Sequence, residues 1–163
     1  MHPNEALIHR FYACFQARDA AGMAACYAPD AVFSDPAFGE LRGPEVGAMW
    51  TMLASRATDL EVRVSGVRAD AERGQAHWDA YYTFGQTGRK VHNSIDATFL
   101  FRDGLIVRHE DNFSFWRWSR QALGPMGLLL GWAPPLRATV RSKARDTLQA
   151  FTARAAHPPA PEE

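Results

Sequence analysis

The sequence predicts an α+β fold in which N-terminal helices cover one face of a curved antiparallel sheet and a helical extension follows. Three observations lead to this prediction. Apolar residues recur with a helical period from residue 4 to residue 56, with a period of two from residue 58 to residue 115, and with a helical period again beyond that point. Helices followed by a run of consecutive strands are typical of an α+β domain.

The composition restricts the size of the protein, its compartment and its partners. A chain of 163 residues with 47% hydrophobic residues is long enough for one globular domain with a real core. Eighteen basic and eighteen acidic residues cancel, so we expect no nucleic-acid partner. Two cysteines indicate reduced thiols, and residues 1–5 do not resemble a signal peptide. The longest apolar run, 126–135, is too short to span a bilayer, so we expect a cytoplasmic protein without a membrane partner.

The first 56 residues predict three helices and one short strand. Asn4 is the expected cap of the first helix, which places Phe11 and Phe15 on its apolar face. A short second helix is expected over 23–27, and a strand over 31–34 that ends at Pro36. Pro44 suits the first turn of a third helix, which runs to about Arg56.

The middle of the chain predicts four strands joined by tight turns. The strands are expected over about 60–67, 76–84, 90–101 and 105–115, with turns at 70–74, 85–88 and 102–104. Beyond them, a helix is expected to end at Gly124, and a last helix to begin at Pro134. The apolar segment 126–132 between them should pack on the domain or on a partner subunit. The basic face of the last helix is expected to be solvated rather than bound to phosphate or to a membrane.

Polar side chains interrupt the mostly apolar face of the predicted sheet. Alternation along the strands places Asn93, His109 and Asp111 on that face. Buried charges need partners, so these residues either line a cavity or form a hydrogen-bond network in the core. Asp35 stands where the first strand meets a loop, where it either opens a turn before Pro36 or carries chemistry.

Two stretches of the chain carry a resemblance to a known family. The run from Tyr27 to Pro36, after two helices, resembles the start of nuclear transport factor 2-like folds, especially the branch of ketosteroid isomerases and SnoaL-like polyketide cyclases. The stretch from Trp78 to Asp111, with its Arg102-Asp103-Gly104 turn, is also similar to SnoaL-like domains. The resemblance covers about residues 4–115 and implies a cone-shaped sheet wrapped around the N-terminal helices, with an apolar pocket at its open end.

The same resemblance implies where a reaction site would lie. Asp35 falls where ketosteroid isomerases hold the carboxylate that moves the proton, and Asp111 falls near the aspartate of SnoaL-type cyclases. The two oxyanion donors of the isomerases would fall at Phe11 and Ala97, which cannot donate, so the sequence argues against steroid isomerisation.

The candidate site and its chemistry follow from these positions. The catalytic candidates are Asp35, His109 and Asp111, and the ligand-binding candidates are Asn93, Tyr82, Trp78, Phe99 and Phe113. A carboxylate in an apolar pocket becomes a better base at neutral pH, which suits cofactor-free proton abstraction next to a carbonyl group. An Asp/His pair could instead activate water for epoxide or ester hydrolysis. We expect no metal, because no third ligand has helpful spacing.

Two classes of function remain open on the sequence alone. The first is a small enzyme that acts on a hydrophobic carbonyl compound, and the second is a non-catalytic protein that binds a small apolar ligand or a partner chain. In either case we expect a homodimer formed through the outer face of the sheet. We also expect an α+β domain over 1–115, a helical extension over 116–156 packed on it, and a disordered tail over 157–163.

Overall fold

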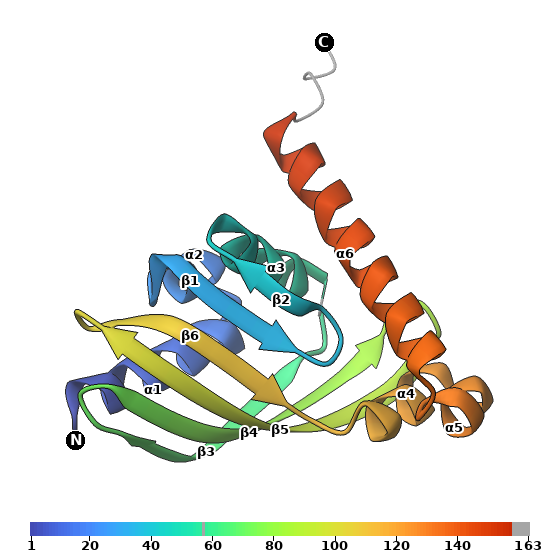
Figure 1. The fold of residues 1–163 in the computed structure, drawn as a ribbon, viewed down its shortest axis with the longest axis horizontal. Helices are drawn as coiled ribbons and strands as arrows, with labels where there is room; N and C mark the ends of the chain where they lie inside the picture. Colours follow the sequence, from blue (N-terminus) through green and yellow to red (C-terminus); the bar gives the residue numbers. More distant parts are fainter. Residues whose placement is uncertain (57, 158–163) are drawn as a thin grey trace.

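The computed structural model describes residues 1–56 and 58–157, which form one six-stranded sheet and six helices (Figure 1). The helices are α1 (Pro3–Gln16), α2 (Ala20–Ala24), α3 (Pro44–Arg56), α4 (Phe115–Leu123), α5 (Pro125–Leu130) and α6 (Pro134–Ala156). The strands are β1 (Tyr27–Asp35), β2 (Gly39–Arg42), β3 (Glu61–Ala69), β4 (Arg73–Phe84), β5 (Arg89–Arg102) and β6 (Leu105–Asn112). This arrangement confirms the predicted α+β fold class.

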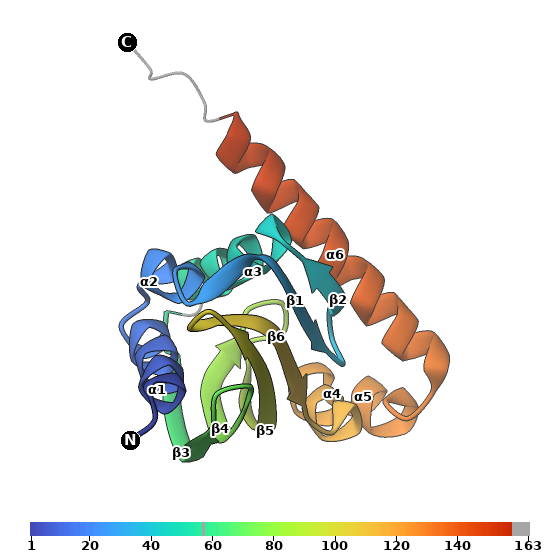
Figure 2. The same ribbon diagram turned by 60° about the vertical axis from the view of Figure 1, so that its left-hand side comes forward.

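The sheet is curled but not closed. Its strand order is β2-β1-β6-β5-β4-β3, and every neighbouring pair is antiparallel except β1 and β6, which are parallel. Strands β3 to β6 therefore form the predicted meander, and the hairpin of β1 and β2 extends the sheet beyond β6 (Figure 2). The helices α1 to α3 bury their apolar faces in the hollow of the sheet, where they form one hydrophobic core with β1, β4, β5 and β6.

The structure corrects the expected path of the chain before Asp35. The second helix ends at Ala24, and Tyr27 already belongs to β1 instead of to a helix. Proline is tolerated within this strand because the register between β1 and β6 shifts between Tyr27 and Val32, where Pro29 needs no ladder partner. The extra strand β2 is too short to be recognised from its sequence.

The cap of the first helix also differs from the expected one. The His2 imidazole accepts a hydrogen bond from the Asn4 backbone N–H at 3.1 Å, and the Glu5 carboxylate accepts one from the His2 N–H at 3.3 Å. The Asn4 side chain instead donates to the backbone oxygens of Asp70 and Ala71 in the turn between β3 and β4. This contact ties the start of α1 to the sheet.

A bulge in β6 changes which residues of that strand face the core. The register between β5 and β6 shifts where Leu100 pairs with Arg108 and Phe101 pairs with Ile106, so Val107 is an extra residue. Ile106 is fully buried, whereas Leu105 and Val107, which strict alternation with His109 would place inward, are only half-buried. Beyond the bulge the alternation resumes as predicted.

The C-terminal helices lie at the end of the sheet and along its β1–β2 edge. Trp118 and Ala122 of α4 form a second core with Val91 of β5, and Tyr82 packs against both cores. Helix α6 passes β2 and α3 and buries Leu148 in the main core (Figure 2). Within the described ranges no helix is long and apolar enough to cross a membrane.

The structure does not describe most of the expected tail. Of the predicted disordered segment 157–163, only His157 lies among the described residues. The division of the chain at residue 115 coincides with the start of α4 but stays a prediction.

Candidate functional site

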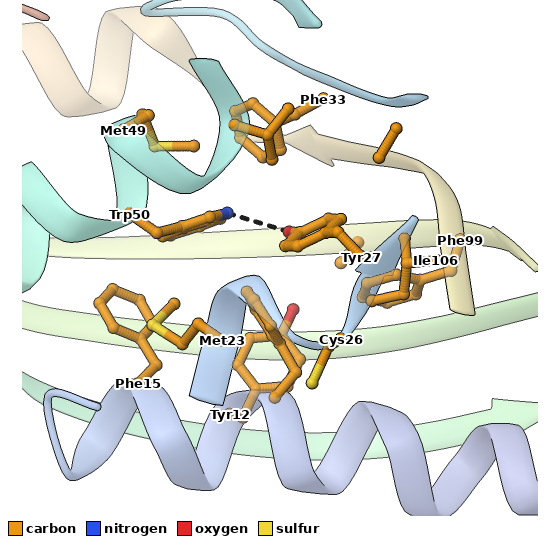
Figure 3. Close-up of a cluster of buried hydrophobic side chains, with 14 of the residues drawn as sticks. Tyr12, Phe15, Met23, Cys26, Tyr27, Phe33, Met49, Trp50, Phe99 and Ile106 are labelled. Atoms are coloured by element: carbon orange, nitrogen blue, oxygen red, sulfur yellow. Dashed lines mark hydrogen bonds between the residues drawn. The ribbon is translucent and has the colours of Figure 1, made fainter. Parts of the chain in front are cut away.

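Five buried side chains form one hydrogen-bonded chain in the core. His109 in β6 lies with its Nε2 2.8 Å from Asp111 Oδ1 and its Nδ1 2.7 Å from the Tyr27 hydroxyl oxygen. Trp50 Nε1 of α3 donates to that hydroxyl at 2.9 Å, as Figure 3 shows. Trp78 Nε1 of β4 donates to Asp111 Oδ1 at 3.3 Å. The prediction that His109 and Asp111 face the inside of the sheet is therefore confirmed.

The directions of these hydrogen bonds follow from the donors at the two ends. An indole N–H can only donate, so the Tyr27 oxygen accepts from Trp50 and has its own hydrogen for His109 Nδ1. His109 then carries its hydrogen on Nε2 and donates it to Asp111. These bonds join the five side chains in the core, which is the hydrogen-bond network that the sequence left open as one of two interpretations.

Aromatic rings fill the space around this network. The His109 ring lies with its centroid 4.4 Å from that of Phe99, 5.2 Å from Phe33 and 5.6 Å from Phe11. Figure 3 shows further members of the same hydrophobic core, among them Tyr12, Phe15, Trp50 and Phe99. The imidazole is fully buried, so the region around His109 on the inner face of the sheet is packed core.

Asp35 lies at the last position of β1, in a different environment. Its Oδ1 accepts hydrogen bonds from the backbone N–H groups of Ala37 at 2.9 Å and Phe38 at 2.5 Å, so the carboxyl group does stabilise the turn into β2. Burial nevertheless raises the pKa of Asp35 from its ordinary value of 3.8 to about 7, although the bonds from Phe38 and Ala37 and the charge of Arg141 act against this. A carboxyl group with this pKa exchanges its proton near neutral pH.

A buried tyrosine hydroxyl lacks a hydrogen-bond partner. Tyr12 on α1 is 2% exposed, and its hydroxyl oxygen is the only fully buried side-chain polar atom without a partner among the described residues. Burial, and then the nearby charge of Asp111, raise the pKa of Tyr12, so the phenol stays protonated and can donate. Its neighbour Phe11 and the strand residue Ala97 are both buried and supply no hydrogen-bond donor.

A second tyrosine stands where the two cores meet. Tyr82 on β4 accepts a hydrogen bond from Trp118 Nε1 of α4 at 2.9 Å, so its own hydrogen is available to another acceptor. Its pKa is raised by burial and further by the charge of Asp35. The predicted wall residue Phe113 packs against the same two cores, and Asn93 is buried on the inward face of β5.

Charge effects tie these groups to one region of the sheet. Asp111 raises the pKa of Asp35 as well as those of Tyr12 and Tyr27, and Asp35 in turn raises the pKa of Tyr82. Such effects act over short distances in a protein interior. The sequence missed Tyr12, Tyr27 and Trp50, because buried aromatic residues on helical or strand faces look like ordinary core positions.

Two surface hollows lie on the outer side of the sheet. The first, of about 590 Å³, lies over β3 to β6 between Arg73 and Arg108, and the second, of about 500 Å³, lies beside Tyr81 and Gln121. Of the predicted site residues, Phe99 borders the first hollow and Tyr82 the second. No group of three or more His, Cys, Asp or Glu in the described parts of the chain could hold a metal ion.

The comparison with family models identifies the fold family. Residues 8–109 match the model of the SnoaL-like domain. The chain belongs to the SnoaL-like family. No curated protein sequence matches this SnoaL-like chain, whereas many solved structures share its fold.

Three of these structures have similar scores. An NTF2-like protein from Burkholderia pseudomallei is 20% identical, with a TM-score of 0.64 over 75% of this chain and 98% of its own. An LEH-like epoxide hydrolase from M. tuberculosis is 19% identical, with a TM-score of 0.64 over 78% of this chain and 96% of its own. TerC, crystallised with polyporic acid, is 19% identical, with a TM-score of 0.63 over 74% of this chain and 98% of its own. At these identities the likeness concerns the fold alone.

Proposed function

We propose that this SnoaL-like protein binds a small hydrophobic carbonyl compound and moves a proton on it by acid/base catalysis without a cofactor. The observation that carries the proposal is the environment of Asp35, whose pKa of about 7 lets the carboxyl group both take and return a proton near neutral pH. Asp35 also lies within the electrostatic reach of Tyr82, whose hydroxyl can donate a hydrogen bond, and both Asp35 and Tyr12 lie within the reach of Asp111.

In the proposed reaction, the Asp35 carboxylate takes a proton from the carbon next to the carbonyl group. The electron pair of the broken C–H bond moves onto the carbonyl oxygen and forms an enolate. Tyr12 and Tyr82 are the proposed donors to that oxygen, because one hydroxyl lacks a partner and the other has a free hydrogen. If a neighbouring C=C bond extends the enolate, return of the proton from Asp35 to its far carbon completes an isomerisation. If instead the enolate carbon attacks a second carbonyl group of the same molecule, a C–C bond forms, and the resulting alkoxide oxygen takes the proton from Asp35, which completes a cyclisation.

The other predicted site residues have supporting parts in this proposal. Asp111 raises the pKa of Asp35, and its bond to His109 keeps the carboxylate in place. Asn93 is a further proposed donor to the ligand. The proposed apolar walls are Trp78, Phe99 and Phe113. The M. tuberculosis structure is named as an epoxide hydrolase, and TerC was crystallised with polyporic acid. Both names point to small organic molecules, which supports this class of ligand without identifying it.

A non-catalytic binding protein is the second candidate, and one observation favours it. Hydrogen bonds join His109, Asp111, Tyr27 and the two indoles to one another in the core, as in a structural network. In that case Asp35 only stabilises its turn, and the protein binds an apolar ligand without changing it.

Exchange of carbon-bound protons for deuterium distinguishes the two candidates without knowledge of the natural substrate. A panel of hydrophobic ketones such as 2-tetralone, incubated in D₂O and followed by NMR, should exchange the protons next to the carbonyl faster with the protein than without it. Asp35→Asn should lower the added rate by about 10²–10⁴-fold, the size expected for loss of a positioned base.

The matched control for this experiment is Asp30→Asn on the same strand, because Asp30 is exposed and pairs only with Arg102. We expect this variant to exchange like the wild type. Binding of the ketones without any added exchange would support the non-catalytic candidate. Equal exchange by wild type and Asp35→Asn would contradict the role of Asp35.

We also propose a cytoplasmic homodimer. Both cysteines are free, and Cys26 is buried, where burial raises its thiol pKa to about 11. Such unreactive thiols suit a reducing compartment. For the dimer, the outer face of β4 and β5 presents His77, His92 and Tyr81 among acidic residues.

A further inference from the structure

Helix α5 and the turn after it carry a cluster of exposed apolar side chains, which we name the apolar tip. The tip consists of Met126, Leu128, Leu129, Leu130 and Trp132, whose exposed fractions run from 49% to 70%. Elsewhere in the described ranges the large exposed apolar residues are Met1 and Leu100. These large side chains therefore do not pack on the domain, and the expected alternative, that segment 126–132 packs on a partner subunit, stays a prediction.

The tip points away from the molecule because its small residues face inward. A Cβ atom on Gly127 would lie 1.9 Å from the Ser119 backbone oxygen, and one on Gly131 would lie 2.1 Å from Ser119 Oγ. Glycine is thus required on the face of α5 that touches α4, and the large side chains are left for the opposite side. The contact is reinforced by Trp116 Nε1, which donates to the Leu128 backbone oxygen at 3.1 Å.

Both views of the fold place this segment at a corner of the molecule. Helix α5 lies beyond α4, on the side far from α1 and α2 (Figure 1 and Figure 2). An exposed apolar cluster of this size usually marks an interaction site. The fixed glycine contact makes a rearrangement in which α5 turns its leucines inward sterically costly.

The charge around the tip indicates what it contacts. Although the whole chain is neutral, residues 112–145 contain six basic residues and no acidic one. Those basic residues are Arg117, Arg120, Arg137, Arg141, Lys143 and Arg145, of which Arg141 lies against Gly39 and Arg145 faces Glu45, away from the tip. Two of the six lie near α5. The Arg120 backbone is next to Gly127 of α5, and its guanidinium lies 4.9 Å from the ring of Trp116, which is hydrogen-bonded to Leu128. Arg137 is in the first turn of α6, which follows Trp132, and its guanidinium lies 5.4 Å from the Phe115 ring of α4. An apolar cluster with a basic border is complementary to a surface that is apolar inside and anionic outside.

We propose that the apolar tip docks on the surface of an anionic lipid bilayer. Its leucines and methionine enter the boundary between headgroups and acyl chains, Trp132 lies at the interface, and the arginines contact lipid phosphates. The sequence-based expectation of no membrane partner rested on the neutral charge of the whole chain and on the lack of a spanning segment, and interfacial docking requires neither. This docking stands independently of the proposed acid/base function.

Sedimentation of the full chain with lipid vesicles tests the proposal. Wild type should bind vesicles of phosphatidylcholine and phosphatidylglycerol at least about tenfold better than vesicles of phosphatidylcholine alone, and salt should weaken the binding. The double variant Leu129→Glu/Trp132→Glu should lose this binding. The double variant Arg120→Gln/Arg137→Gln should lose about fivefold per arginine. Leu100→Glu, which places a charge at an exposed leucine away from the tip, is the matched control and should bind like the wild type.

Three results would overturn the proposal. Wild type that ignores phosphatidylglycerol vesicles is the first, and tip variants that bind as well as the wild type are the second. The third is a dimer, measured by light scattering, that is lost in the variant Leu129→Glu/Trp132→Glu and is unaffected by added vesicles. In that case the tip would contact a second copy of the chain and not a bilayer. Unchanged urea denaturation of the variants shows that any loss of binding comes from the surface and not from the fold.

Discussion

At the scale of single residues, opposing influences act on the pKa of the Asp35 carboxyl group. Burial raises its pKa most, the negative charge of Asp111 adds to this, and the N–H groups of Phe38 and Ala37 oppose it. The turn therefore holds Oδ1 in place without lowering the pKa to that of a surface aspartate. The same contacts that make Asp35 a turn residue also fix its position for chemistry.

The raised pKa predicts how stability changes with pH. Folded Asp35 keeps its proton up to about pH 7, whereas the unfolded residue releases it near its ordinary pKa of 3.8. The folded state binds more protons in between, so this group lowers the free energy of unfolding as pH rises through that window. Asp35→Asn cannot ionise and should be more stable than wild type at pH 8 by about 1–3 kcal/mol, but not below pH 4. Urea denaturation of both proteins between pH 4 and pH 8 tests this prediction. A difference in the free energy of unfolding that does not depend on pH would contradict it.

The hydrogen-bonded chain at His109 predicts a large effect of one missing oxygen atom. Tyr27→Phe leaves Trp50 Nε1 and His109 Nδ1 unpaired in the core, so the free energy of unfolding should fall by about 2–4 kcal/mol. Tyr81→Phe removes the same atom on the outer face of the sheet and should change it by less than about 0.5 kcal/mol. Chemical denaturation of both variants tests the difference, and similar small losses would show that the chain contributes little.

At the scale of elements, the position of α5 depends on contact between backbones. Gly127 touches Ser119 so closely that the helix has no room for a Cβ atom there. The large residues of α5 are exposed as a consequence of this contact, and Ser119 Oγ adds a hydrogen bond to the Gly127 oxygen at 3.4 Å. One small residue thus decides which face of the helix meets solvent.

Gly127→Ala should separate α5 from α4. The added methyl group forces the helices apart, and we expect a loss of about 1–3 kcal/mol in the free energy of unfolding together with faster proteolysis between residues 124 and 134. Gly85→Ala is the control, because a Cβ atom there would meet nothing within 4 Å. Equal proteolysis of the two variants would show that the contact does not hold the helix.

At the scale of the whole molecule, the outer face of the sheet is the proposed dimer surface. His77 Nδ1 lies 2.8 Å from Asp96 Oδ1, His92 Nε2 lies 2.7 Å from Asp79 Oδ1, and the Tyr81 ring stacks on that of His92 at 4.3 Å. These contacts hold the side chains of the face in positions that a second copy can match. The dimer and the apolar tip are thus assigned to different parts of the molecule.

Light scattering at micromolar concentration should give twice the mass of one 18.2 kDa chain. Tyr81→Asp places a charge in the middle of the proposed surface and should give the monomer, while Leu129→Glu/Trp132→Glu should remain a dimer. A wild type with the mass of a single chain would contradict the proposed assembly.

The sequence predicted those parts of the molecule that depend on local periodicity. Along β5 every second residue from Val91 to Phe101 is buried, as the alternation predicts. The bulge at Val107 could not be predicted, because an extra residue in one strand leaves no mark on its own alternation. Strand β2 has only four residues, one of them glycine, and forms because β1 offers it an edge.

The candidate site was predictable to a similar extent. Alternation and the family resemblance brought His109, Asp111 and Asn93 to the inner face. The partners Tyr27 and Trp50 lie on two other elements, and only the folded arrangement joins them to His109. Tyr12 could not be singled out, since its missing partner is a property of the whole fold.

The proton equilibrium of Asp35 is the central claim of this account, and NMR measures it directly. A titration that follows the ¹³C signal of the Asp35 carboxyl carbon, assigned by comparison with Asp35→Asn, should give a midpoint near pH 7. Addition of a hydrophobic ketone that the protein binds should shift this midpoint. A midpoint near 4, unchanged by any such ligand, would contradict the assignment of Asp35 as an acid/base group.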